Sequence, residues 1–194
     1  PTQLYDYFSD AFQTGNQFKN SVSLSGGTEQ ITFNSSLSQL SQKGILPGTD
    51  FKNYQARINS NIKTSDKLSF AFNTAINNSG GSRGRAGRFM EQLIYWSPRY
   101  DVRDAFNENG TVKAYTSDNI NPVGQALTNK FNDDVLRVIS SFSTAYKPFS
   151  WLDLNHTIGV DAYRDERKAT APAFQGLEGE YSMSDNGVEA APGL

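Results

Sequence analysis

The clearest pattern in the sequence is an alternation of apolar and polar residues between Leu152 and Ala162. Leucine, isoleucine, valine and alanine share one parity with His156, and the other parity carries aspartate, asparagine, threonine and glycine. Because successive side chains of a strand point to opposite faces, this segment predicts a strand with one apolar and one polar face.

The same alternation recurs about six times along the chain, in segments of about ten residues. The predicted strands are Lys19–Ser25, Gln30–Leu40, Asn53–Lys63, Leu68–Asn77, Val135–Tyr146 and Trp151–Tyr163. In a soluble sandwich the apolar face of each strand meets a second sheet. In an outer-membrane barrel the apolar face meets lipid and the polar face lines a lumen.

The connections between these strands alternate in length. Gly26–Gly27, Thr64–Lys67 and Lys147–Ser150 form short turns, whereas the connection over residues 44–48 is of medium length and the one over 78–133 is long. Transmembrane barrels place short turns on one side of the membrane and long loops on the other. A soluble sandwich has no physical reason to alternate in this way, so the pattern favours a barrel.

Aromatic residues also collect at the ends of the predicted strands. Tyr146, Phe149 and Trp151 flank one short turn, and Tyr54 and Tyr163 lie at the opposite strand ends. Aromatic girdles at the two membrane interfaces have this distribution. The positions therefore add to the argument for a transmembrane β-barrel.

Composition removes several other classes of protein. The 194 residues include no cysteine, which excludes disulfides and thiolate chemistry, and a net charge of −2 gives no general reason to bind nucleic acid. Mean hydropathy is −0.56 and no long apolar run occurs, so a transmembrane helix is excluded. The chain begins at Pro1 without a signal peptide, and we expect it to be an internal segment of a longer protein.

Several short stretches stand out by their order and spacing. They are Tyr5–Phe8, Gln13–Gly15, Asn20–Gly27 (NSVSLSGG), Gln42–Phe51 (QKGILPGTDF), Arg57–Asn59, Asn121–Pro122 and Gly159–Tyr163. Together they resemble the SusC/RagA family of TonB-dependent outer-membrane transporters, over most of the chain between Tyr5 and Pro172.

The resemblance implies an all-β fold, an antiparallel transmembrane β-barrel of roughly 22 strands with a plugged lumen. This chain would supply about six of those strands, together with long extracellular loops. We expect residues 1–17 to lead into the barrel, 18–77 to form four strands and 78–133 to form a long extracellular loop with a short helix. Residues 134–163 would add two strands, and 164–194 would begin a further extracellular loop.

The resemblance also implies a function, the import of glycans or peptides across the outer membrane of a Gram-negative cell. The implied partners are a SusD-like surface lipoprotein, the TonB complex, the remaining barrel and plug, outer-membrane lipid, and an oligosaccharide or peptide substrate. We expect no enzyme activity, cofactor, bound metal or nucleic-acid partner. The alternative is a soluble all-β carbohydrate-binding module with the long loop as its site.

Candidate substrate-binding residues lie in and beside the long loop. Tyr95, Trp96 and Tyr100 are placed either to stack on a sugar or peptide or to pack a small core of the loop itself. Arg83 and Arg85 belong to a glycine-rich segment, GGSRGRAGR. This segment lacks the Gly-Lys-Ser/Thr of a phosphate-binding loop, so a flexible basic loop at the barrel mouth is the favoured interpretation.

Two cations and one histidine complete the set of candidates. Arg57 and Lys63 share the polar parity of their strand, so a barrel would point them into the lumen, against the plug or into water. His156 is the sole histidine, and its apolar parity separates it from Asp153 and Asp161. A Ser-His-Asp hydrolase is therefore disfavoured, and His156 interrupts an otherwise apolar stripe.

Overall fold

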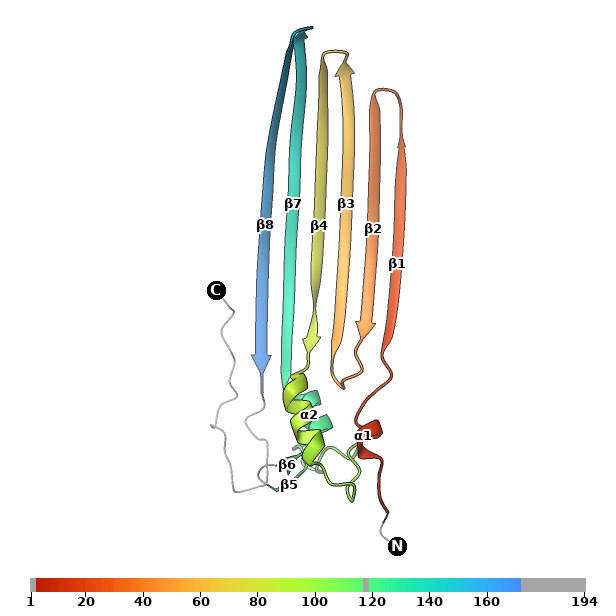
Figure 1. Cartoon of the computed structure of the whole chain (residues 1–194), viewed down its shortest axis with the longest axis vertical. Coiled ribbons are helices and arrows are strands. Elements are labelled where there is room, and N and C mark those ends of the chain that lie inside the picture. The colour runs from red at the N-terminus through yellow and green to blue at the C-terminus, as the bar shows by residue number, and fades with distance from the viewer. Residues whose placement is uncertain (1–2, 117–118, 172–194) are drawn as a thin grey trace.

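Six long strands form one antiparallel sheet in the order β1-β2-β3-β4-β7-β8 (Figure 1). The structure is a computed structural model that describes residues 3–116 and 119–171. The strands are β1 (Asn16–Gly27), β2 (Ile31–Lys43), β3 (Asp50–Ser65), β4 (Leu68–Arg83), β7 (Lys130–Phe149) and β8 (Leu152–Thr170). The antiparallel all-β fold predicted from the alternation is confirmed.

Short turns close one end of the sheet, here called the turn end, and longer segments lie at the opposite loop end (Figure 1). At the loop end, residues 44–49 join β2 to β3 and residues 84–129 separate β4 from β7. The turn predicted at Gly26–Gly27 lies instead at residues 28–30. Both glycines belong to β1, where Gly27 pairs with Thr32.

The strands extend past their predicted bounds at the loop end. There, β4 reaches Arg83, β7 begins at Lys130 and β8 reaches Thr170. Apart from the paired residues Phe131 and Ala169, the extensions are polar or glycine on both parities, so they carry no alternation, although the backbone pairing continues through them. Part of the segment predicted as a flexible basic loop is therefore strand.

One character predominates on each face of the sheet, although the polar parity also carries Leu40, Phe51, Val135 and Ile139. On the face called apolar, one row of paired residues comprises Val22, Leu37, Ala56, Ile76, Val138 and Ala162. On the polar face, a neighbouring row comprises Ser21, Ser38, Gln55, Asn77, Arg137 and Tyr163. Among the described residues no second sheet covers either face, so the opposing layer that a soluble sandwich needs is not found there.

A compact unit, here called the cap, packs at the loop end (Figure 1). It contains α1 (Tyr7–Asp10), α2 (Ala86–Tyr95), β5 (Ala114–Thr116), β6 (Asn119–Ile120) and α3 (Pro122–Thr128), with the connections between them and residues 44–49. The buried hydrophobic cluster of the described chain lies in this cap and comprises Ala11, Phe89, Leu93, Trp96 and Val102. In the described part of the chain, no helix combines the length and apolarity needed to cross a membrane.

The helix α3 was not predicted from the alternation. Asn121 caps its first turn, because the side-chain Oδ1 accepts a hydrogen bond from the Gly124 amide at 2.9 Å. The same side chain donates through Nδ2 to the Val102 carbonyl at 2.9 Å, which ties α3 to the cap core. An Asn-Pro pair is a recognised signal for a helix start, and Pro122 occupies the first helical position here.

Candidate functional site: two faces and a cap

The apolar face has the height of a membrane barrel's lipid-facing band. On β4 it runs from Leu68 at the turn end to Asn78 at the loop end. About ten residues at about 3.4 Å each span about 34 Å along the strand, and a tilt of about 40° reduces this to about 26 Å. The apolar bands of outer-membrane barrels are about 25 Å tall.

Polar and aromatic side chains border this band. At the loop end the paired residues Asn20, Gln39, Tyr54 and Asn78 cross four strands. At the turn end the rings of Phe149 and Trp151 stack at a centroid separation of 5.5 Å. Tyr163 does not join this border, because its pairing with Arg137 puts it on the polar face. The predicted aromatic distribution therefore holds for Tyr54 but not for Tyr163.

A few polar side chains lie within the apolar band, and one cross-strand pair of them is hydrogen-bonded. The hydroxyls of Thr74 and Ser140 lie 2.8 Å apart on adjacent strands, so these two residues hydrogen-bond each other. His156 pairs with Thr144, one row inward from Tyr146 at the turn-end border. In an outer-membrane barrel, a position one row inside this border is close to the headgroup region, where a polar tip is tolerated. The register also places Asp161 on the opposite face from His156.

The polar face is a hydrogen-bonding surface with a few charges. The Arg137 guanidinium and the Asp161 carboxylate form an ion pair, with Nε and Oδ1 2.9 Å apart. Arg57 lies between Ser36 and Ala75 on this face, is exposed, and forms no ion pair with any of the described residues. The predicted orientation of Arg57 toward the polar side of the sheet agrees with this register.

Lys63 lies at the turn end rather than in the middle of the polar face. Its ammonium contacts the Asp66 carboxylate at 2.8 Å across the turn between β3 and β4. The hydrogen bond from Lys63, followed by the attraction of its charge, lowers the pKa of Asp66 below its ordinary value. Lys63 and Arg57 are thus separate features, and only Arg57 faces the centre of the polar surface.

The aromatic candidates of the cap differ in exposure. Trp96 is only 2% exposed, and its Nε1 donates to the Tyr100 carbonyl at 3.0 Å. Its ring packs against Tyr115, which stacks on Tyr100 at a centroid distance of 3.6 Å. Trp96 therefore packs the cap's own core, one of the two alternatives for these residues. Tyr95 is 71% exposed and Tyr100 is 39% exposed, so both present surface to solvent.

The two candidate arginines do not join the aromatics in one cluster. Arg83, at the end of β4, forms an ion pair with the buried Asp133 of β7. Arg85 precedes the first turn of α2, and Tyr95 ends that helix, about 15 Å away along a helix of this length. The five loop candidates therefore divide into a charged strand end and an aromatic helix end.

Hydrogen bonds and an ion pair connect Arg103 to Asp101 in the loop that follows α2. The Asp101 carboxylate accepts hydrogen bonds from the backbone amide and the Nε of Arg103, both at 2.9 Å. The side-chain hydrogen bond from Arg103 is the main cause of a lowered Asp101 pKa. Burial raises the pKa of the nearby Tyr115 phenol. In the described residues, no cluster of three or more carboxylate or imidazole groups is placed to hold a metal ion.

No protein-family model and no curated protein matches this chain. Solved structures do match it. The RagAB peptide importer in its 'closed-closed' state aligns with a TM-score of 0.66 and 17% identity, over 88% of this chain and 20% of that one. The 'open-open' state aligns with a TM-score of 0.65 and 18% identity, over 87% of this chain and 20% of that one. A further structure, of the RagAB peptide transporter, aligns with a TM-score of 0.66 and 17% identity, over 86% of this chain and 20% of that one.

This chain therefore spans about a fifth of the length of those solved chains. At this level of identity the likeness shows the fold, which is that of a part of the RagAB chain. The fold resemblance to the SusC/RagA family, which the sequence stretches predicted, is confirmed.

Proposed function

We propose that this chain forms part of the wall of a TonB-dependent outer-membrane transporter of the SusC/RagA type. The observation that carries this proposal is the two-faced sheet. Its apolar face has the height of a bilayer's hydrocarbon band, its polar face is lined with hydrogen-bonding side chains, and its fold matches part of RagAB. The open edges of β1 and β8 would pair with further strands, because lipid does not tolerate unpaired strand edges.

In this proposal the polar face lines the lumen and the cap stands at the extracellular mouth. The long segments of the sheet lie together at the loop end, which supports that orientation. Arg57 would face the plug or a passing substrate, and Lys63 would lie at the periplasmic rim. Tyr95 and Tyr100 are exposed aromatics that a substrate would reach, whereas Trp96 supports Tyr100 from within the cap.

The substrate class proposed is a peptide or an oligosaccharide. The likeness to an importer of peptides supports a peptide. The neutral amides and hydroxyls of the polar face suit either class, because both substrates offer many hydrogen-bonding groups. A SusD-like lipoprotein would cover the mouth, and the TonB complex would supply energy through a part of the protein outside this chain.

A matched pair of substitutions in the full-length protein tests the wall and the transport together. Phe72 lies on the apolar face near the middle of the band, and its neighbour Asn73 lies on the polar face. Phe72→Arg puts a cation into lipid, which costs about 2–4 kcal/mol at the bilayer midplane. We expect it to reduce the amount of folded, heat-modifiable barrel in outer membranes, whereas Asn73→Arg leaves this amount unchanged.

Uptake of a dye-labelled oligopeptide or oligosaccharide by the same cells measures transport. We expect uptake with the parent protein and with Asn73→Arg, loss with Phe72→Arg, and loss in every strain after a protonophore is added. Equal membrane yields for the two variants, or uptake that survives the protonophore, would contradict the proposal.

A further inference from the structure

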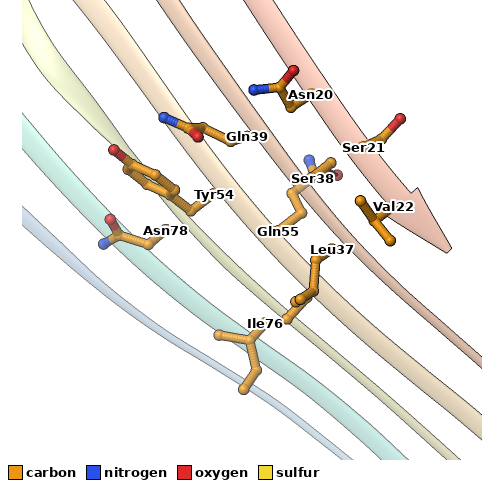
Figure 2. A pocket seen from close by; sticks show the side chains of 11 residues that line it. Asn20, Ser21, Val22, Leu37, Ser38, Gln39, Tyr54, Gln55, Ile76 and Asn78 are labelled. Carbon is orange, nitrogen blue, oxygen red and sulfur yellow. Dashed lines mark hydrogen bonds between the residues drawn. The ribbon is translucent and has the colours of Figure 1, made fainter. Parts of the chain in front are cut away.

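A hollow of about 390 Å³ opens on the apolar face over β1 to β4. Figure 2 shows the side chains around it, with Val22, Leu37 and Ile76 on one side and Gln39, Tyr54 and Asn78 on the other. The hollow lies within the face that the proposed function puts in contact with lipid. The inference drawn from it therefore rests on that proposed function.

The floor of the hollow exists because a small residue stands between larger ones. Ala56 pairs with Leu37 on one side and with Ile76 on the other. A methyl group between two longer aliphatic side chains leaves a depression in the surface. Water inside such a depression finds no hydrogen-bond partners on the aliphatic side, whereas a hydrocarbon chain fills it and packs against the aliphatic side chains.

The side chains that line the other side of the hollow are polar and uncharged, and a carboxylate, that of Asp134, lies outside this lining, in the row of Lys52 but two strands away on β7. Asn20, Gln39, Tyr54 and Asn78 are paired in a single row across β1 to β4. Asn78 is fixed by a hydrogen bond of 3.0 Å from its Nδ2 to the Asp134 carboxylate. This row lies at the loop-end border of the apolar band. If the loop end is extracellular, the row lies at the depth of the headgroups of the outer leaflet.

A cation lies just beyond this row on the same face. Lys52 is two residues from Tyr54 on β3, and it stands between Ser41 of β2 and Gly80 of β4. It is exposed and forms no ion pair with the rest of the described chain. An exposed ammonium at headgroup depth attracts anionic groups such as phosphate.

We propose that this hollow binds one outer-leaflet lipid that carries both an acyl chain and an anionic phosphate headgroup. The acyl chain lies against Ala56 between Leu37 and Ile76. The amides and phenol of the polar row hydrogen-bond the neutral part of the headgroup, and Lys52 pairs with its phosphate. The apolar floor, the neutral hydrogen-bonding row and Lys52 thus follow one another along the face in the same order as the acyl chain, the neutral part of the headgroup and the phosphate of the lipid.

Two substitutions separate the apolar and the charged parts of this site, and each has a matched control. Ala56→Trp fills the hollow, and its control is Ala162→Trp, in the same row of the apolar face but on β8, outside the hollow. Lys52→Gln removes the cation, and its control is Lys19→Gln. Lys19 lies at similar height on β1 but on the opposite face of the sheet.

The test uses the full-length protein, reconstituted in nanodiscs of phosphatidylcholine, to which diphosphoryl lipid A is added. The protein is then transferred from the nanodiscs into a mild detergent, and native mass spectrometry counts the lipid A molecules that remain bound to each protein. We expect one retained lipid A for the parent protein and both controls, at least tenfold weaker retention for Ala56→Trp, and severalfold weaker, less salt-dependent retention for Lys52→Gln. Should Ala56→Trp lower the yield, Ala56→Leu gives the same comparison with a smaller side chain.

Equal retention by Ala56→Trp and Ala162→Trp would overturn the lipid site, because the lipid would then be part of the general annulus. That result leaves the membrane placement intact, since all variants would still be folded barrels. Failure of the parent protein itself to enter the outer membrane would instead overturn the proposed function.

Discussion

Trp96 shows how one side chain of the cap can be structural while its neighbour is available for binding. The Trp96 ring is enclosed by the cap and contacts Tyr115, and its indole nitrogen is bonded to the Tyr100 carbonyl. Tyr95 precedes it in the sequence and points its ring to solvent, with 71% of its surface exposed. A one-residue step at the end of α2 thus separates a core residue from a surface residue.

We therefore expect Trp96→Ala to destabilise the cap by about 3–5 kcal/mol, the usual cost of removing a buried aromatic side chain. Limited trypsin digestion of the membrane-inserted protein measures this, because the cap contains several arginines and lysines. Tyr95→Ala is the control and is expected to leave the cleavage rate unchanged. A cap equally resistant in both variants would show that Trp96 does not hold it together.

At the scale of single elements, two glycines allow close approaches of the strands at the loop end. A Cβ at Gly81 would stand 2.2 Å from the Asp50 carbonyl oxygen, and one at Gly80 would stand 2.3 Å from the Asp133 carbonyl oxygen. Next to them, the Ser82 amide donates to the Asp50 carboxylate at 3.0 Å. These contacts bring β4 against β3 and β7 just before the chain enters the cap.

We expect Gly81→Ala to force β3 and β4 apart at this point and to cost about 1–3 kcal/mol. Gly159→Ala is the control, because a Cβ there meets its nearest atom at 3.6 Å, an ordinary contact. Hydrogen exchange of the backbone amides of residues 50–52 reports the change. We expect these amides to exchange faster in Gly81→Ala and at the parent rate in Gly159→Ala. Identical exchange rates in the two variants would contradict the packing role of Gly81.

The strand centres could be predicted from the sequence because their two faces differ. The ends of β4, β7 and β8 could not, since residues such as Asn132 and Lys168 are polar on either face and leave no alternation to detect. Helix α3 is signalled by Asn121–Pro122 at its start but lacks a long apolar repeat. The hollow around Ala56 was beyond prediction, because it depends on which residues of neighbouring strands are paired.

At the scale of the whole molecule, the segregation of turns and cap to opposite ends predicts a defined orientation in the membrane. Glu108 is an exposed residue of the cap, and Ser150 is an exposed residue of a short turn. The chain has no cysteine of its own, so a single cysteine at either position can be followed. The proposed transporter places Glu108 outside the cell and Ser150 in the periplasm.

We expect Glu108→Cys to react with a membrane-impermeant maleimide in intact cells. Ser150→Cys is expected to react only after the outer membrane has been opened. Labelling of Ser150→Cys in intact cells, with Glu108→Cys protected, would show that the orientation is reversed.

The pairing of β4 with β7 has a consequence for insertions in the long segment between them. The two strands remain in register up to Arg83 and Phe131, so the segment between them leaves and rejoins the wall at adjacent positions. Adjacent paired strands are about 5 Å apart, and insertions are tolerated best where the two ends lie close together. An insertion in the segment between β4 and β7 is therefore expected to leave the pairing of these two strands in place.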